Sequence, residues 1–465
     1  MTQQEMLQAL QDLIGADKVR TDTDALITFG RDWTKIHEPK PSAIVFPRST
    51  QEVQALVKFA NQHQLALVPS GGRTGLSAGA VATQGEIVVA FDYMNKLLEF
   101  NPVDRSVTVE AGMITEQLQQ IAEEKGLFYP VDFASAGSSQ IGGNISTNAG
   151  GIKVIRYGMT RDWVTGLRVV TGQGDILELN NRGLLKNNTG YDLRHLFIGA
   201  EGTLGLITEA TIQLARAPKD LQVLVLGVVG MAEVMQVLHT FQTSLDLTAF
   251  EFFSHNALEK VVEHQGLNAP FDTQAPYYAL IEFETTQEEQ LEEAMRLFEA
   301  CVEQGWVVDG AMSQSEQQAQ NLWRLREDIS ETISQYTPYK NDISVRVSKV
   351  PQFLAEVDQV VSEHYPDFEI VWFGHIGDGN LHLNILKPEN LAKEEFFSRC
   401  HQVSQWVFAI VSRYQGSVSA EHGVGLIKKD YLHHTRTPEE IAYMKAIKRA
   451  FDPHNVLNPG KIFDL

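Results

Sequence analysis

The sequence predicts an α+β protein of two domains, and three observations carry this prediction. The chain has 465 residues, more than a single domain of ordinary size. Strand-like and helix-like segments alternate along most of it. Of its 35 glycines, 14 lie between residues 137 and 205, so long glycine-rich loops are concentrated in the first half. We expect a first domain over 1–219, a second over 220–424, and a C-terminal segment, 425–465, that returns to the first domain.

The first domain begins with an amphipathic helix. Thr2 and Glu5 fit a capping box, and Met6, Leu10 and Leu13 fall on one face of the helix that follows. The spacing of apolar residues then predicts helices over 50–61 and 115–125, and strands over 43–46, 65–68, 87–91, 106–109, 167–170 and 176–179.

The pattern of predicted elements changes near Pro218, after which strands and helices follow one another with fewer long loops. This pattern is typical of an α/β domain built on an antiparallel sheet. We expect strands over 223–229, 249–253, 278–283 and 306–309, and helices over 231–243, 288–304, 313–335, 350–364 and 393–414. The final stretch, 437–465, is expected to be a helix followed by an extended tail.

Charge and cysteine content exclude several classes of protein. With 38 basic and 59 acidic residues, the net charge is −21, which argues against nucleic acid or anionic lipid as partners. Cys301 and Cys400 are too few for a disulfide framework, and we expect two buried thiols.

The N-terminus lacks the pattern of a signal peptide. The longest apolar run, 223–232, is much shorter than the ~20 residues of a membrane span. We therefore expect a soluble, cytoplasmic protein.

Three glycine-rich loops indicate a large ligand. They read PSGGRTGLSAGA at 69–80, SAGSSQIGGNISTNAGG at 135–151 and GAEGTLGLITEA at 199–210. Small residues of this kind leave backbone N–H groups free to bind a pyrophosphate. Neither a Rossmann GxGxxG motif nor a P-loop occurs. One such loop would be explained by turn chemistry alone, but three in one domain favour extensive backbone contact with a ligand.

In order and spacing, these loops resemble the FAD-binding domain of the vanillyl-alcohol-oxidase-type flavoproteins. The tail NPGKIF at 458–463 fits the same family. The resemblance implies FAD, which some members of the family attach covalently through a His or a Cys. Because Arg73 and Thr74 occupy the centre of the first loop and neither cysteine lies in this domain, we predict noncovalent FAD. It implies cofactor contacts from Ser70, Gly71, Gly72, Arg73, Thr74, Gly75, Gly137, Ser138, Gly142, Gly143, Asn144, Thr147, Gly150, Glu201, Gly202, Ile207 and Asn458.

The segment WFGHIGDGNLHLNI at 372–385 predicts a β-hairpin that carries two histidines. If Asp378 and Gly379 form a type I′ turn, His375 lies directly opposite His382, and Asn384 projects from the same face. Two imidazoles placed in this way suit a metal ion; a simple cross-strand pair in a hydrated sheet is the alternative.

The segment GSVSAEHGVG at 416–425 supplies a candidate third ligand, Glu421, and next to it His422. Two histidines and one carboxylate suit Zn²⁺, Fe²⁺, Mn²⁺ or Co²⁺, and the residues themselves leave this choice open. A surface acid beside a hydrogen-bonded histidine is the alternative for this pair.

Four segments together resemble the FAD-linked D-2-hydroxyacid dehydrogenases: LRE with a following Ser, PYKNDIS, GHIGDGNLHLN and SAEHGVG. The resemblance implies that His375, His382 and Glu421 bind a divalent metal, with zinc preferred. It implies that His422 is the catalytic base and contacts the substrate. It also implies substrate contacts from Arg326, Ser330, Lys340 and Asn384. Ser330 stands where threonine is expected, so the hydroxyl is retained.

The two cations among these residues favour a diacid substrate. Arg326 and Lys340 would be left unpaired by a monoacid such as lactate, at a cost in affinity. We therefore predict oxidation of D-2-hydroxyglutarate, and of D-malate as a shorter diacid, to the 2-oxo acid, with hydride transfer to flavin N5. The alternative is a D-lactate or glycolate dehydrogenase of the same architecture. A metal-dependent oxygenase and a non-catalytic electron carrier are more distant alternatives. The family implies an electron-transfer flavoprotein or a quinone route as acceptor, and we expect a homodimer.

Overall fold

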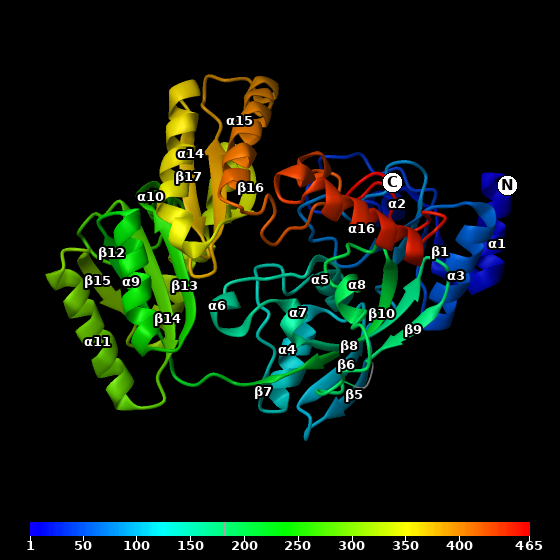
Figure 1. Cartoon of the computed structure of the whole chain (residues 1–465), viewed down its shortest axis with the longest axis horizontal. Helices are drawn as coiled ribbons and strands as arrows, with labels where there is room; N and C mark the ends of the chain where they lie inside the picture. The colour runs from blue at the N-terminus through cyan, green and yellow to red at the C-terminus, as the bar shows by residue number, and fades with distance from the viewer. Residues whose placement is uncertain (181–182) are drawn as a thin grey trace. The chain divides into compact units, whose positions relative to one another are not determined.

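The computed structural model describes residues 1–180 and 183–465, which divide into two compact units. Unit 1 comprises residues 1–150, 158–217 and 421–465. Unit 2 comprises residues 151–157 and 218–420. Figure 1 shows the elements of each unit, coloured by residue number. Among the described residues, no helix has the length and apolar character needed to cross a bilayer.

The first helix of unit 1, α1 (Gln3–Ile14), has the predicted capping box. The backbone N–H of Thr2 donates to Glu5 Oε2 at 2.7 Å, and that of Glu5 donates to Thr2 Oγ1 at 3.2 Å. Of the three residues predicted to share one face, Met6 and Leu10 are buried and Leu13 is 39% exposed. Ile14, four residues after Leu10, is the third buried residue of this helix.

Unit 1 contains two main sheets and a short strand pair. The four-stranded sheet, in the order β1-β2-β4-β3, consists of Val19–Arg20, Ala43–Val45, Ile87–Ala90 and Leu67–Ser70. The five-stranded sheet, β5-β6-β10-β8-β9, consists of Leu97–Asn101, Ser106–Glu110, Gly205–Gln213, Val164–Thr171 and Ile176–Leu179. The pair β7 and β11 consists of Leu127–Phe128 and Ala215–Arg216.

The helices of unit 1 pack on two apolar clusters, a large one and a smaller one that contains Ala25 of the second helix. These helices are α2 (Thr23–Phe29), α3 (Thr50–His63), α4 (Thr115–Glu124), α5 (Ile141–Thr147), α7 (Thr160–Trp163), α8 (Arg194–Phe197) and α16 (Pro438–Phe451), with short 3₁₀ turns at Ala16–Lys18 and Lys429–His434. The predicted strands and helices of this region are present, with ends that differ by a few residues.

Unit 2 is built on one seven-stranded sheet whose neighbouring strands all pair antiparallel within the described residues, as the sequence predicts. Its order is β15-β12-β14-β13-β17-β18-β16, or Val307–Met312, Leu221–Val228, Tyr277–Glu284, Leu247–Ser254, Glu369–Gly374, Asn380–Leu386 and Tyr339–Ser344.

Helices cover both faces of this sheet. One face packs against α10 (His255–Gln265) and α12 (Glu316–Glu327), whose apolar residues share a core with Val223, Phe253 and Phe373. The other carries α9 (Met231–Ser244) and α11 (Glu288–Glu303). The remaining helical segments are α6 (Val154–Tyr157), α13 (Ile329–Thr332), α14 (Val350–His364) and α15 (Lys393–Arg413), with 3₁₀ turns at Ile333–Tyr336 and Val347–Lys349. In Figure 1, α14 and α15 lie side by side.

One helix prediction and the cysteine prediction for unit 2 can be compared with the structure. The helix predicted over 313–335 is interrupted, because α12 ends at Glu327 and α13 begins at Ile329. Cys301 and Cys400 are buried free thiols, as predicted, and burial raises the pKa of each, to about 11 and about 12. Such thiols are packing groups rather than nucleophiles at neutral pH.

Candidate flavin and metal sites

The predicted flavin loops pack directly against one another within unit 1. A Cβ atom at Gly72 would lie 2.1 Å from the carbonyl oxygen of Ser138, so the backbones of the first and second loops touch. A Cβ atom at Gly202, in the third loop, would lie 2.5 Å from Cγ of Pro69. Glycine at these two positions is therefore a requirement of close packing between loops that are far apart in sequence.

Hydrogen bonds join the C-terminal tail to this cluster. The backbone N–H of Asn458 donates to the carbonyl oxygen of Leu67 at 2.7 Å. The Asn458 side-chain amide donates to the carbonyl oxygens of Gly79 and Glu201, at 2.8 and 2.7 Å. Glu201 in turn donates its N–H to Ser146 at 2.8 Å. The three loops and the NPGKIF tail thus form one connected group.

Three buried polar atoms in these loops and the C-terminal tail have no hydrogen-bond partner among the described residues. They are Ser70 Oγ, Gln140 Oε1 and Asn458 Oδ1. Leaving such an atom unpaired costs about 1–3 kcal/mol of stability. The cluster therefore fits a ligand that carries both hydrogen-bond donors and acceptors, and FAD carries both. Sequence reasoning did not include Gln140; its position inside the second glycine loop is the signal that could have indicated it.

Arg73 fixes the shape of the first loop. Its guanidinium donates to the carbonyl oxygen of Gly71 at 2.6 Å, pairs with Asp92 at 3.0 Å and lies 4.5 Å from the ring centroid of Phe29. Its backbone φ is 62°, a left-handed conformation that costs energy outside glycine. Because Asp92 already matches the charge of Arg73, a ligand contact there would come mainly from the backbone.

The other predicted flavin residues lie in the same segments. Asn144 is buried, and its amide donates to Thr115 Oγ1 at 2.6 Å, so this side chain supports the loop from within. Gly71, Thr74 and Gly75 follow β3, Gly137 and Ser138 precede α5, Gly142, Gly143 and Thr147 belong to α5, Gly150 follows it, and Ile207 lies on β10.

The histidine motif forms a wider hairpin than the sequence predicts. Phe373, rather than His375, lies opposite His382. The predicted turn at Asp378 and Gly379 is wrong, because a type I′ turn needs positive φ at both residues and only Gly379 has it, at 84°. The carbonyl oxygen of His375 accepts the N–H of Asp378 at 3.1 Å and so closes a different turn.

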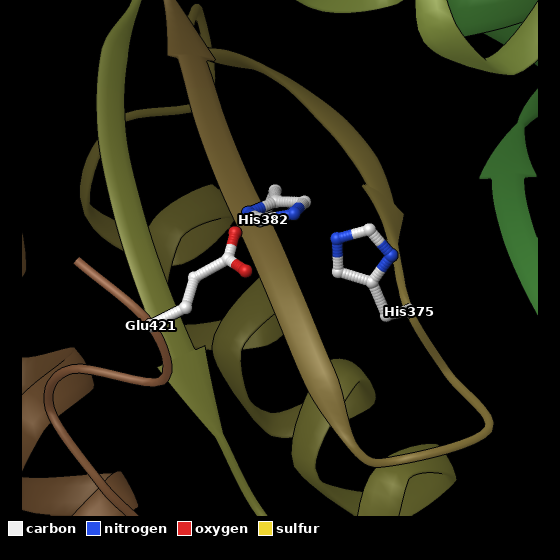
Figure 2. A group of neighbouring side chains, drawn as sticks. All are labelled: His375, His382 and Glu421. Carbon is white, nitrogen blue, oxygen red and sulfur yellow. The ribbon is translucent and has the colours of Figure 1, made fainter. Parts of the chain in front are cut away.

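Despite this register, the structure brings the three predicted metal ligands together. The rings of His375 and His382 lie 5.2 Å apart, nearly perpendicular. One ligand atom from each of His375, His382 and Glu421 lies within 4.8 Å of the other two (Figure 2). Glu421 directly follows Ala420, whose N–H donates to Asp342 Oδ2 at 3.1 Å. Two imidazoles and a carboxylate are a donor set that suits zinc and its neighbours in the first transition row.

Two buried carboxylates behind the histidines were not predicted. Glu251 Oε1, on β13, accepts a hydrogen bond from His375 Nδ1 at 2.8 Å. Asp342, on β16, lies 3.7 Å from His382 Nδ1 and accepts the side-chain amide of Asn380 at 2.7 Å. Glu251 is the only charged residue in the apolar stretch LTAFEFFS, and this isolation was the sequence signal that could have indicated it. His422 Nε2 lies 3.7 Å from Glu421 Oε1, beside the same group.

Lys340 and Ser330, both predicted substrate contacts, are hydrogen-bonded to each other. Lys340 Nζ donates to Ser330 Oγ at 2.8 Å. Loss of water around the ammonium lowers the pKa of Lys340 below its ordinary value, although the residue as a whole is exposed. In the part of the chain that the structure describes, no carboxylate pairs with this cation.

Arg326 has a different environment, because it is 5% exposed and lies beside Glu251. Its Nη2 lies 2.8 Å from Glu251 Oε2, and the guanidinium is 4.7 Å from the ring centroid of Phe373. Among the described residues, Nε and Nη2 make no hydrogen bond of good geometry. N–H groups of Arg326 therefore remain available to donate to another acceptor.

Asn384, another predicted substrate contact, is 1% exposed. Its side-chain amide donates to the carbonyl oxygen of Val371 at 3.3 Å.

Comparison with known proteins identifies the family to which each half of the chain belongs. Residues 41–180 match the family described as FAD binding domain, and residues 217–462 match FAD linked oxidases, C-terminal domain. The fold resembles that of p-cresol methylhydroxylase with a TM-score of 0.77 and 17% identity, covering 99% of this chain and 97% of that one. The predicted fold class is confirmed, and the chain is an FAD-linked oxidoreductase.

Sequence relatives define the group more closely. The chain is 65% identical, over 463 residues and the full length of both proteins, to a D-2-hydroxyglutarate dehydrogenase of Stutzerimonas stutzeri. It is 54% identical to one of Xanthomonas citri pv. viticola, over 98% of this chain and 96% of that one. The chain therefore belongs to the D-2-hydroxyglutarate dehydrogenase family of FAD-linked oxidases.

Proposed function

We propose that this chain oxidises D-2-hydroxyglutarate to 2-oxoglutarate, with noncovalent FAD and a divalent metal, preferably zinc. One observation carries the choice of a diacid. On adjacent strands, Asp342 lies opposite His382 and Lys340 lies opposite Asn384. The cation thus stands two residues, about 7 Å, along the same sheet face from a candidate metal ligand. A dicarboxylate could place one end at the metal and the other at Lys340.

The roles of the metal ligands follow from their chemistry. His375, His382 and Glu421 would hold the ion, which supplies a Lewis acid toward the substrate hydroxyl, while FAD supplies the hydride acceptor. His422 is the proposed base, because neutral imidazole can take the hydroxyl proton near neutral pH. Its partly exposed ring allows that proton to pass on to water.

The remaining residues would orient the substrate. Lys340, supported by Ser330, would bind the distal carboxylate, and the uncommitted donors of Arg326 would bind a carboxylate oxygen. Asn384 would contact the substrate on the same face. A monoacid would leave Lys340 without a counter-ion, which disfavours D-lactate and glycolate, the second candidate substrates. D-malate keeps both carboxylates and is proposed as a weaker substrate.

We propose the loop residues from Ser70 to Gly75, from Gly137 to Gly150, Glu201, Gly202, Ile207 and Asn458 as the FAD contacts. An electron-transfer flavoprotein or a quinone route is the proposed acceptor, a homodimer the proposed assembly and the cytoplasm the proposed compartment. The proposed domain limits lie between residues 219 and 220 and between residues 424 and 425.

Anaerobic reduction of the flavin tests the proposal directly. D-2-hydroxyglutarate should bleach the flavin faster than D-malate, and both much faster than D-lactate at equal concentration. Treatment with a chelator should abolish bleaching, and added Zn²⁺ should restore it. Faster reduction by D-lactate would overturn the diacid assignment, and bleaching that survives complete metal removal would overturn the metal assignment.

A further inference from the structure

We infer that Glu251 is a positioning residue for the metal site, and that it links His375 to Arg326. This inference rests on the proposed metal site. Glu251 itself is not a candidate ligand; it would act through the imidazole of His375. In Figure 2, one ring nitrogen of His375 points toward His382 and Glu421 and the other points away from them. The hydrogen bond to Glu251 engages Nδ1.

Glu251 is a buried carboxylate, so it needs neighbouring groups that compensate its charge. The residue is 1% exposed, in the middle of β13, with Phe250 and Phe252 on either side. Burying an isolated carboxylate in such a place is strongly unfavourable, because the charge loses its water. Oε1 accepts the Nδ1–H of His375. Oε2 makes no hydrogen bond of good geometry among the described residues, but it lies 2.8 Å from Arg326 Nη2, so the two form an ion pair.

The backbone fixes His375 on both sides of this contact. Just before it, Gly374 pairs with Phe252 across β17 and β13. Just after it, the N–H of Gly377 donates to the carbonyl oxygen of Phe250 at 3.0 Å. The remaining freedom of His375 is rotation of its ring. A carboxylate can only accept, so Glu251 fixes that rotation and places the proton on Nδ1, leaving Nε2 as the free electron pair for a metal.

Arg326 would then influence metal binding without touching a ligand. Its charge faces the same carboxylate that orients His375, so removal of Arg326 would leave Glu251 with one partner fewer. The alternative is a purely structural ion pair that joins α12 to β13. That alternative predicts a loss of thermal stability with no change in metal affinity, so the two roles can be separated.

The chain offers a matched control in Glu282 on the neighbouring strand β14. This carboxylate is also buried, at 4% exposure, accepts the indole N–H of Trp323 at 2.9 Å and pairs with Lys153. It contacts none of the candidate metal ligands in the described structure. Glu282→Gln should therefore reproduce the structural cost of neutralising a buried acid without the effect on the metal.

The experiment measures Zn²⁺ affinity by competition with a chromophoric chelator, in full-length protein that holds FAD. We expect Glu251→Leu to weaken Zn²⁺ binding about 10–100-fold, the range seen for loss of such outer partners. Glu251→Gln, which keeps an acceptor oxygen, should weaken it less, and Arg326→Met should weaken it several-fold. FAD content should stay the same in all variants, and Glu282→Gln should bind Zn²⁺ like the wild type.

Zn²⁺ affinity that stays within twofold of wild type in Glu251→Gln and Arg326→Met would overturn the inference and leave the metal site standing. Failure of the wild type itself to bind Zn²⁺ would overturn the proposed site, and the inference with it. If Glu251→Leu does not fold, the nearly isosteric Glu251→Gln decides the matter. As a second readout, the ring ¹⁵N shifts of His375 in metal-free protein should show the Nδ1–H tautomer in the wild type and a mixture in Glu251→Leu.

Discussion

Glu201 holds Gly425 by a hydrogen bond of 2.8 Å from the backbone N–H to Oε2, and its other oxygen accepts the N–H of Val424 at 2.6 Å. The sequence indicated Glu201 only as a flavin contact. Its carboxylate in fact anchors the loop that follows His422, all within unit 1. Burial is the largest influence on the pKa of Glu201 and raises it to about 6. The two hydrogen bonds and nearby lysines act in the opposite direction and lower it.

The raised pKa of Glu201 predicts a pH-dependent stability. Between pH 4.5 and about 6 the folded chain binds this proton more tightly than the unfolded chain, so its contribution favours folding below pH 4.5 and is lost as the pH rises through 6. The loss is roughly 2 kcal/mol. Relative to Glu201→Gln, which does not titrate, the wild-type melting temperature should therefore fall across this window by several degrees. A difference that rises instead would contradict the assignment.

Replacing Lys340 tests the diacid site. Lys340→Met should lower kcat/KM for D-2-hydroxyglutarate by about 10–100-fold, the worth of a hydrogen bond to a charged group. The reaction with D-lactate should change little, because that substrate has no distal carboxylate. Lys349→Met, at an exposed position of the same unit, is the control and should leave both rates unchanged. Equal losses for the two substrates would place Lys340 elsewhere than at the distal carboxylate.

Two glycines of the flavin loops should respond differently to alanine. At Gly72 a methyl group would lie 2.1 Å from the Ser138 carbonyl oxygen, so Gly72→Ala should lower the melting temperature even without FAD. At Gly143 a Cβ meets no atom within 4 Å, so Gly143→Ala should leave the FAD-free protein stable. If FAD occupies that space, Gly143→Ala should nevertheless weaken FAD binding, which flavin fluorescence would measure. Unchanged affinity there would remove Gly143 from the proposed contacts.

Local patterns in the sequence predict those parts of the site that depend on local chemistry. The three glycine loops, the capping box at Thr2 and the antiparallel sheet of unit 2 all follow from spacing and residue type. The hairpin register does not, because the strongest short turn signal, Asp378-Gly379, loses to contacts of its loop with β13. Even so, a shift by two residues preserves the face of a strand, so His375 and His382 still meet.

Residues that act through another residue are harder to find in the sequence. Glu251 lies 124 positions from His375, and the pairing arises only when β13 and β17 become neighbours. The same is true of Arg326, whose helical position indicates a face but gives no sign of Glu251 as its neighbour. Nothing in the local pattern fixes such partners, since they depend on which strands the fold places side by side.

The pair formed by Lys153 and Glu282 provides a last test, of stability alone. Both side chains are nearly buried, and Lys153 belongs to the short segment 151–157 that packs with unit 2. Removing one partner of a buried pair costs about 3–5 kcal/mol, so Lys153→Met should lower the melting temperature by roughly 6–20 °C. The double variant Lys153→Met with Glu282→Gln should recover part of this loss, because no bare carboxylate remains. Losses that simply add would mean that the two side chains do not stabilise each other.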